Sequence, residues 1–436
     1  FIFVVDLYNE GVDIPNIDTI LFLRPTQSLT IFLQQLGRGL RLAPGKEFLT
    51  VLDFIGQANR KYRFAEKFAA LVRKTKRSIS EEIKSGLPNV PSGCCVQLER
   101  IAQDYVLDNI RHQLATKNHL ISLLQDFQST GEPLSLENFL AFARIPLTDI
   151  YKSSRKEGFM RLATIAGCRK EFTEPDEKLI SRALPRFASF DDAEFCHFCL
   201  RVLSKPESIP QELPPLKDLY LKMLYFTFWD ASLEHRTAAA VIREKLASLS
   251  RNPVLLGEVQ ELIAYRLKNI RGRSLNNTFL FPCPLRIHAH YTRNQICAAF
   301  DMLMPTNLRQ GVYQIKEKHC DLFFVTLNKS EKDYSPTTMY QDYSINDTLF
   351  HWESQSTTAA ESPTAQRYFN HRKLGQHILL FVREYKEDTL GKMPYLFLGE
   401  ADYVSHEGSR PVSIVWRLRT PIPADFINVT NKLVNE

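Results

Sequence analysis

The segment Gln34-Gln35-Leu36-Gly37-Arg38-Gly39-Leu40-Arg41 follows a helix-like run opened by Ser28 and precedes a strand-like run over residues 48–54. Its two arginines are three residues apart, so we expect them on one face of a helical turn, where they can converge on one small anion. Guanidinium groups suit phosphate because their planar fork donates two parallel charge-assisted hydrogen bonds. The neighbouring glycines let a phosphate or a second backbone come close. A solvated helix end is the alternative interpretation of this turn taken alone.

The residues before this turn favour an α/β fold. An apolar strand is expected over residues 1–5, and it leads into the loop Asp6-Leu7-Tyr8-Asn9-Glu10-Gly11-Val12-Asp13-Ile14-Pro15. A second strand is expected over residues 19–23. The order is therefore strand, loop, strand, helix with two arginines, strand. This order is typical of doubly wound α/β proteins, whose functional loops lie at strand ends.

Both segments resemble motifs of a known enzyme family. The loop resembles motif V of superfamily II helicases, in the Glu-Gly-x-Asp-x-Pro form of the excision-repair and restriction-type branch. The turn resembles motif VI of the same family, Gln-x-x-Gly-Arg-x-x-Arg. The residues that match motif VI are Gln34, Gly37, Arg38 and Arg41.

The resemblance implies a role for each motif residue. Arg38 and Arg41 would reach the γ-phosphate of ATP, which is held with Mg²⁺ mainly by the other RecA-like lobe. One of them would act as an arginine finger, an effect worth roughly 10³–10⁵ in rate. Gln34 would lie at the interface between the lobes. The residues that would couple the nucleotide site to a nucleic-acid backbone contact are Glu10, Gly11, Asp13 and Gly37.

Other parts that phosphoryl transfer needs are missing from the sequence. It contains no Gly-x-x-x-x-Gly-Lys-Ser/Thr loop and no Asp-Glu-x-His-like acidic motif. These elements cradle the phosphates and hold the metal ion. We therefore expect that this chain alone does not hydrolyse ATP, and that it is the C-terminal fragment of a longer enzyme.

Length and composition limit the class of protein. The 436 residues are enough for roughly two to four domains. The 55 Lys and Arg residues against 49 Asp and Glu give a net charge of +6, so only local clustering favours a polyanion. No apolar run approaches the roughly 18 residues of a membrane span, and we expect no membrane partner and a cytoplasmic location.

The eight cysteines are irregularly spaced, as expected in a cytosolic protein. The only Cys-x-x-Cys is Cys196-His197-Phe198-Cys199, which lacks a second ligand pair at zinc spacing. We expect core cysteines there, and no metal site in the chain.

Residues 57–273 are predicted to form a helical accessory region. In it, residues 57–77 interleave basic side chains with an apolar stripe, which indicates either a solvated helix face or a contact to phosphates. Further on, short helices over 136–140 and 147–151 are consistent with a helix-turn-helix near 135–165, or with a plain αα-hairpin. The candidate nucleic-acid contacts in the basic stretch are Arg60, Lys61, Arg63, Arg73 and Lys74.

Residues 274–436 are predicted to form a β-rich C-terminal domain, mixed or barrel-like. One substantial helix is expected over residues 291–303. Together with the helical region, this end resembles the C-terminal region of one bacterial branch of these helicases, which carries a domain of unassigned function. The expected strands are 311–315, 322–327, 348–352, 377–383, 395–399 and 412–418.

Polar and aromatic residues in this domain allow a pocket that binds a flipped or modified base. Trp352 and tyrosines would stack on the base, while Glu353 and Gln355 would bond its edge. The alternative is that Trp352 and Trp416 are core aromatics. A nuclease is less favoured, because Asp321 has no acidic partner at the usual spacing.

The predicted fold class is therefore multidomain: a partial second RecA-like lobe over 1–56, an all-α middle over 57–273 and a β-rich end over 274–436. The predicted function is the C-terminal part of an ATP-dependent DNA helicase or translocase of a restriction or repair system. Its expected partners are DNA and the N-terminal helicase lobe. The alternatives are a non-catalytic DNA recognition module of a defence or repair system, and a scaffold whose basic stripes are mere surface.

Overall fold

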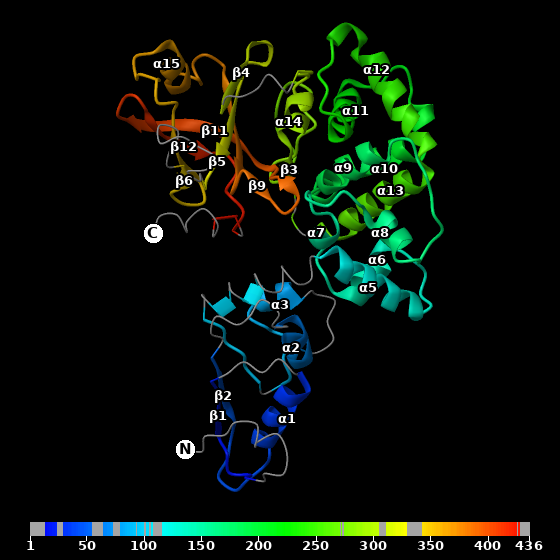
Figure 1. Ribbon diagram of the computed structural model, residues 1–436. Coiled ribbons are helices and arrows are strands. Elements are labelled where there is room, and N and C mark those ends of the chain that lie inside the picture. Colours follow the sequence, from blue (N-terminus) through cyan, green and yellow to red (C-terminus); the bar gives the residue numbers. More distant parts are fainter. Residues whose placement is uncertain are drawn as a thin grey trace. The chain divides into compact units, whose positions relative to one another are not determined.

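The computed structural model describes residues 14–23, 29–54, 64–72, 79–92, 94–99, 102–103, 106–107, 116–270, 272, 274–304, 311–328, 342–424 and 426–427. The chain is a mixed α/β protein (Figure 1). It divides into two compact units, Phe1–Ile150 and Tyr151–Glu436. The predicted domain boundaries near residues 56 and 273 stay predictions.

The first unit begins with a strand, a helix and a second strand. These are β1 (Thr19–Phe22), α1 (Leu29–Gly39) and β2 (Thr50–Asp53). The two strands pair in parallel with a helix between them, which is the βαβ arrangement. Phe22 on β1 packs against Phe32 on α1 with ring centroids 5.5 Å apart. The predicted order over residues 19–54 is confirmed, while the strand expected over 1–5 lies outside the described residues.

Short helices follow in the first unit. α2 (Phe64–Leu71) and α3 (Ile79–Lys84) share a small core that includes Phe64, Phe68 and Ile83. The later helices are α5 (Lys117–Ser129), α6 (Leu136–Ala143) and α7 (Leu147–Ile150).

Local capping sets the limits of these later helices. The side chains of Thr116 and Ser135 accept hydrogen bonds from the first turns of α5 and α6. Arg144 adopts a left-handed conformation that ends α6 shortly before Pro146. The two short helices predicted over 136–140 and 147–151 are therefore confirmed as α6 and α7.

The second unit begins with helices whose ends are capped by distant carboxylates. Glu258 on α13 accepts hydrogen bonds from the backbone N–H groups of Phe159 and Met160, the first residues of α8. Glu174 accepts from Val254 and Leu255 at the start of α13, at 2.7 and 3.0 Å. The helices are α8 (Phe159–Ile165), α9 (Glu177–Ala188), α10 (Ala193–Ser204), α11 (Pro215–Phe228), α12 (His235–Ser248) and α13 (Pro253–Lys268), with 3₁₀ turns η1 (Pro206–Ser208) and η2 (Leu249–Arg251).

A mixed sheet forms the rest of the second unit (Figure 1). Its order is β4-β5-β8-β11-β12-β7-β6, with β3 paired to β11. Within this sheet, only β5 and β8 pair in parallel among the described strands. The strands are β3 (His290–Tyr291), β4 (Val312–Ile315), β5 (Cys320–Thr326), β6 (Tyr343–Ser344), β7 (Leu349–Glu353), β8 (His377–Arg383), β11 (Tyr395–Glu407) and β12 (Ser413–Leu418), and β9 (Glu387–Asp388) pairs separately with β10 (Gly391–Lys392).

All six strands predicted in this region are found, although β11 runs to Glu407 rather than ending at Gly399. The domain was predicted to be mixed or barrel-like, and its sheet is mixed. Among the described strands, β4 and β6 are the first and last in the sheet order. The expectation of one substantial helix was wrong. α14 (Arg293–Ala299) begins later than predicted because Thr292 caps it, and it already ends at Ala299. A second helix, α15 (Pro363–Phe369), follows a cap at Ser362.

Two aspartates at the start of α10 connect the helices of the second unit to its sheet. Asp192 caps α10 and also accepts a hydrogen bond from the hydroxyl of Tyr291 on β3. Asp191 accepts from the backbone N–H of His290 at 2.8 Å. The helices and the sheet of the second unit are therefore fixed to each other. No helix among the described residues is long and apolar enough to cross a membrane.

Candidate functional site

The motif residues lie at the C-terminal end of α1. Gln34 and Gly37 are exposed on the helix, and Arg38 is half-buried in its last turn. The helix ends at Gly39, so Arg41 lies beyond its last residue. The expectation that both arginines share one helical face was therefore wrong, because the backbone leaves the helix between them.

Lys46 fixes the segment that carries Arg41. Its ammonium donates hydrogen bonds to the carbonyl oxygens of Gly39, of Arg41 at 2.9 Å and of Pro15 at 3.2 Å. A cation at this position also interacts favourably with the negative end of the helix dipole. Sequence reasoning missed Lys46, although a basic residue shortly after a helix end is a known capping signal.

The two glycines near Arg38 have different surroundings. A Cβ atom on Gly39 would lie 2.6 Å from Cδ1 of Ile20 and 2.8 Å from Cδ2 of Leu49, so this glycine allows α1 to approach the chain around β1 and β2. A Cβ atom on Gly37 would meet nothing within 4 Å. Gly39 is thus required for packing, whereas Gly37 leaves space beside Arg38.

Several predicted contacts lie outside the described residues: Glu10, Gly11, Asp13, Arg60, Lys61, Arg63, Arg73 and Lys74. Lys67, from the same basic stretch, is described and is 7% exposed. It forms an ion pair with Asp53 at the end of β2, and its ammonium lies 4.0 Å from the ring centroid of Phe32. Its charge is therefore used inside the first unit rather than presented to a phosphate.

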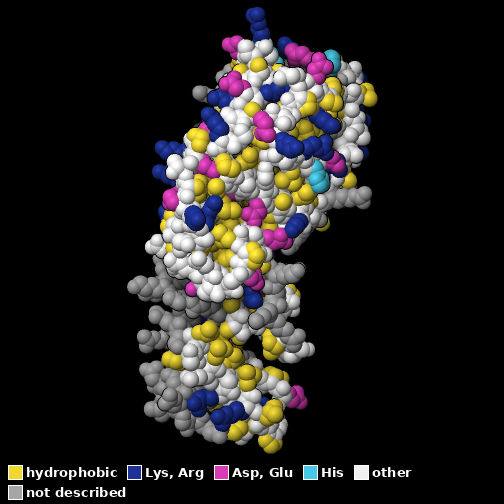
Figure 2. All heavy atoms as spheres, turned by 90° about the vertical axis from the view of Figure 1, so that its right-hand side faces the viewer, with side chains coloured by type: hydrophobic (Ala, Val, Ile, Leu, Met, Phe, Trp, Pro, Cys, Tyr) yellow, Lys and Arg dark blue, Asp and Glu magenta, His cyan; other side chains and the backbone are white. Residues whose placement is uncertain are grey.

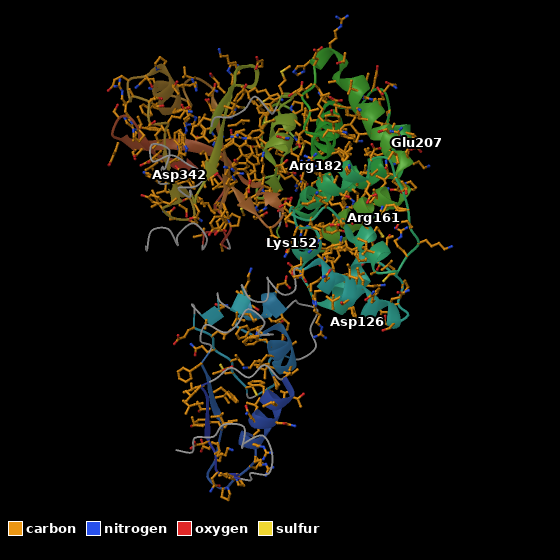
Figure 3. All side chains as sticks on the ribbon, in the orientation of Figure 1. Asp126, Lys152, Arg161, Arg182, Glu207 and Asp342 are labelled. Carbon is orange, nitrogen blue, oxygen red and sulfur yellow. The ribbon has the colours of Figure 1, made fainter. Side chains whose placement is uncertain are left out.

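The basic residue Arg161, near the predicted helix-turn-helix, is also engaged within the protein. Arg161 (labelled in Figure 3) donates to both carboxylate oxygens of Glu177 at 2.6 Å. Its guanidinium lies 4.0 Å from the ring centroid of Phe172. A DNA-reading role for residues 135–165 stays a prediction. On the face shown in Figure 2, Lys and Arg side chains lie among Asp and Glu side chains, so their charges partly cancel.

The sheet places the predicted base-binding residues on two different faces. Trp352 is 6% exposed, and its ring centroid is 4.4 Å from Phe323 and 5.9 Å from Tyr368. Trp416 is fully buried in the same core. Both are core aromatics, which was the alternative interpretation, so Trp352 is not placed to stack on a base. Glu353 is half-buried on the other face, and Gln355 is exposed after the strand.

Asp321 is fully buried, and both of its carboxylate oxygens accept hydrogen bonds. Arg367 donates to both its carboxylate oxygens at 3.0 Å, and the side chain of Gln376 donates to Oδ2 at 3.0 Å. Burial raises the pKa of Asp321 although these hydrogen bonds oppose the shift. The described residues contain no group of three or more His, Cys, Asp or Glu that could hold a metal ion.

A second acidic cluster, on β11, holds two exposed arginines. Asp402 accepts from Arg372 Nε at 2.9 Å and from Arg419 Nη2 at 3.0 Å, and Arg419 also bonds Glu400. Burial acts to raise the pKa of Asp402, but the hydrogen bonds and charges of the two arginines hold it well below its ordinary value. Sequence reasoning did not find this cluster, because its members come from separate segments.

Cys196 and Cys199 lie on α10 and are both buried. Burial raises the pKa of Cys196 to about 12. The predicted core position of these cysteines is confirmed.

Comparisons with known proteins connect two parts of the chain to earlier work. Residues 285–429 match the family model described as "Domain of unknown function (DUF3427)". A stretch of 53 residues is 47% identical to "Putative ATP-dependent helicase IRC3" of Saccharomyces cerevisiae. That stretch is 12% of this chain and 8% of the yeast protein, so the chain spans only a small part of this relative's length.

Proposed function

We propose that this chain is the C-terminal part of an ATP-dependent DNA helicase or translocase, in which the end of α1 supplies an arginine finger. The observation that carries the proposal is the placement of Arg38 and Arg41 at the C-terminal end of the helix of a parallel βαβ unit, before its second strand. The similarity of a 53-residue stretch to a protein named as a helicase supports it.

Apolar side chains on the βαβ unit support its association with further polypeptide. Leu21 and Leu52 are opposite each other in the β1–β2 pair and are 45% and 47% exposed. Leu42 and Phe48 are also exposed. The two strands that the structure describes here, with exposed leucines, are a poor independent sheet, because stable sheets need more strands or a covering layer. We propose that other parts of the helicase cover this surface.

The chemistry assigned to this chain is charge stabilisation. ATP and its Mg²⁺ would be held mainly by the other lobe and would supply the transferred phosphoryl group. Arg38 would donate hydrogen bonds to the oxygens on which negative charge develops during transfer. Lys46 would hold the backbone of Arg41 in place after the helix end.

The test is DNA-stimulated ATP hydrolysis by the complete protein. Arg38→Ala is expected to lower the rate by roughly 10³-fold or more while leaving DNA binding largely intact. Arg38→Lys is expected to lower the rate of ATP hydrolysis as well, because an ammonium group lacks the planar fork of a guanidinium. The control is Arg236→Ala, which removes an exposed arginine on α12.

ATPase activity that survives Arg38→Ala would mean that the motif VI assignment is wrong. The non-catalytic DNA recognition module would then be the better account. Arg41→Ala, measured in parallel, decides which of the two arginines is the finger.

A further inference from the structure

We propose that the outer face of β11, β12, β7 and β6 binds single-stranded nucleic acid. We define this outer face by Asp402 on β11, Arg417 and Arg419 at β12, His351 on β7 and Tyr343 on β6, together with Arg372, which reaches Asp402 from the loop after α15. This proposal rests on the proposed function in one respect, namely that the polyanion is a nucleic acid.

Alternation along the strands separates this face from the core. On β7, Phe350 and Trp352 are buried, while Leu349, His351 and Glu353 are half-buried. β12 alternates in the same way, with Ile414, Trp416 and Leu418 in the core. Residues opposite each other in an antiparallel pair project to the same face. The pairs Asp402–Arg417, Val415–His351 and Tyr343–His351 therefore place their side chains on one surface.

Arginines gather at one end of this face. The side chains of Arg372 and Arg419 are 66% and 47% exposed, and both form a fork on Asp402, whose side chain is 9% exposed. Arg417 lies directly across from Asp402 and is exposed.

This arrangement differs from a purely structural ion pair. Arg367 also forks on a buried aspartate, Asp321, but its own side chain is only 22% exposed. Around Asp402 the carboxylate is buried and the guanidiniums face solvent. The Nε and Nη2 atoms of Arg372 are bonded to Asp402. The Nη1 edge of Arg372 is therefore turned outward, where it suits a phosphate.

Aromatic rings lie further along the same face. Tyr343 and His351 stack with centroids 4.6 Å apart and an interplanar angle of 15°. Asp342 (labelled in Figure 3) accepts a hydrogen bond from the backbone N–H of Glu353 at 3.0 Å, which joins β6 to β7 beside this pair. Arg417 pairs with Leu349 on β7. His351 is two residues further along that strand, which is a distance of about 7 Å.

This combination fits single-stranded nucleic acid better than a duplex. Arginines attract the phosphates of either form. Unpaired bases can also leave their neighbours and stack on protein rings, whereas bases inside a duplex cannot reach a sheet face in this way. Glu353 on the same face could accept a hydrogen bond from a base edge, which is the part of the original base-binding hypothesis that the sheet retains.

The test is fluorescence anisotropy of the whole chain with labelled oligo(dT), oligo(U) and a duplex DNA, titrated with salt. The chain is expected to bind the single strands more tightly than the duplex. Tyr343→Ala is expected to weaken binding roughly 5- to 150-fold, and Tyr343→Phe to retain most of it. Arg417→Gln is expected to reduce the slope of log K against log salt by about 0.7, the contribution of one phosphate in a single strand.

Matched controls remove the same groups elsewhere. Arg236→Gln takes an exposed arginine from α12, and Tyr385→Ala takes an exposed tyrosine from outside the outer face. Both are expected to bind like the unchanged chain. Unfolding curves of all variants check that the sheet is intact, and Arg417→Gln gives a second test if Tyr343→Ala does not fold.

Three results would overturn the inference: no binding at low salt, tighter binding of the duplex, or losses in the two control variants equal to those in Tyr343→Ala and Arg417→Gln. None of them bears on the arginine finger, whose test is ATP hydrolysis by Arg38 variants. Conversely, a loss of ATPase without any effect of Tyr343→Ala on nucleic-acid binding would support the helicase proposal alone.

Discussion

The ammonium of Lys46 donates a hydrogen bond to the carbonyl oxygen of Pro15 at 3.2 Å. Pro15 closes the loop that resembles motif V, and Lys46 follows the segment that resembles motif VI. The same ammonium bonds the carbonyl of Arg41 at 2.9 Å. One side chain therefore joins the two segments that are expected to sense nucleic acid and nucleotide.

Lys46→Met is expected to lower the stability of the first unit by about 0.5–1.5 kcal/mol. The change keeps most of the apolar stem but removes the donors to Gly39, Arg41 and Pro15, while water can replace part of what is lost. Denaturant unfolding and hydrogen exchange of the first unit measure the effect. Lys84→Met, in the last turn of α3, is the control and is expected to change stability by less.

Gly39→Ala and Gly37→Ala are expected to act in opposite directions. The new Cβ of Gly39→Ala would clash with Ile20 and Leu49, at a cost of about 1–3 kcal/mol. Gly37→Ala has open space and gains about 0.5–1 kcal/mol from helix propensity.

Thermal unfolding of the two variants measures this difference. The reverse order of stabilities would contradict the packing described for the end of α1. In the complete protein, Gly37→Ala is nevertheless expected to lower ATPase activity, because under the proposed function the space beside Arg38 admits nucleotide or the other lobe.

Gly158→Ala is expected to destabilise the second unit by about 1–3 kcal/mol. Its Cβ would lie 2.5 Å from both Oε1 of Glu258 and Cδ1 of Leu184, so the cap on α8 must shift. Gly257→Ala, one residue before Glu258 on α13, meets nothing within 4 Å and is expected to be neutral or slightly stabilising. Urea unfolding compares the two. Equal effects would argue against the close approach of α8 and α13.

The buried carboxyl of Glu258 is expected to make stability depend on pH. Burial raises its pKa from 4.5 to about 7, against the opposing effect of its backbone hydrogen bonds. The folded state then binds more protons than the unfolded state between these values. The contribution of Glu258 is therefore fully present below pH 4.5 and is lost as pH rises through about 7.

The measurement is the free energy of unfolding across this pH range for the unchanged chain and for Glu258→Gln. Their difference is expected to change by up to roughly 3 kcal/mol between the two pKa values. A difference that does not vary with pH would show that Glu258 is ionised throughout.

Local patterns in the sequence predicted most elements of the second unit. The strand over 377–383 was found with its limits as β8, because a continuous apolar run is bounded by polar residues. α15 was missed although Ser362 and Pro363 form a normal helix start. A helix of seven residues is too short to show a clear period among the surrounding polar residues.

The faces of the strands could not be predicted from the same patterns. The alternation on β7 is visible in sequence, but only the neighbouring strands decide that Trp352 points into the core and His351 away from it. The cluster around Asp402 depends on Arg372 and Arg419, which are 30 and 17 residues away. Short-range spacing carries no signal for such contacts.

The most direct test of the arginine finger is the affinity of the complete protein for ADP with aluminium fluoride, which mimics the transferring phosphoryl group. Arg38→Ala is expected to weaken binding of this complex strongly while leaving the affinity for ADP alone nearly unchanged, because the guanidinium acts on charge that develops only during transfer. Equal affinity of Arg38→Ala and the unchanged protein for the aluminium fluoride complex would contradict the proposed role of α1.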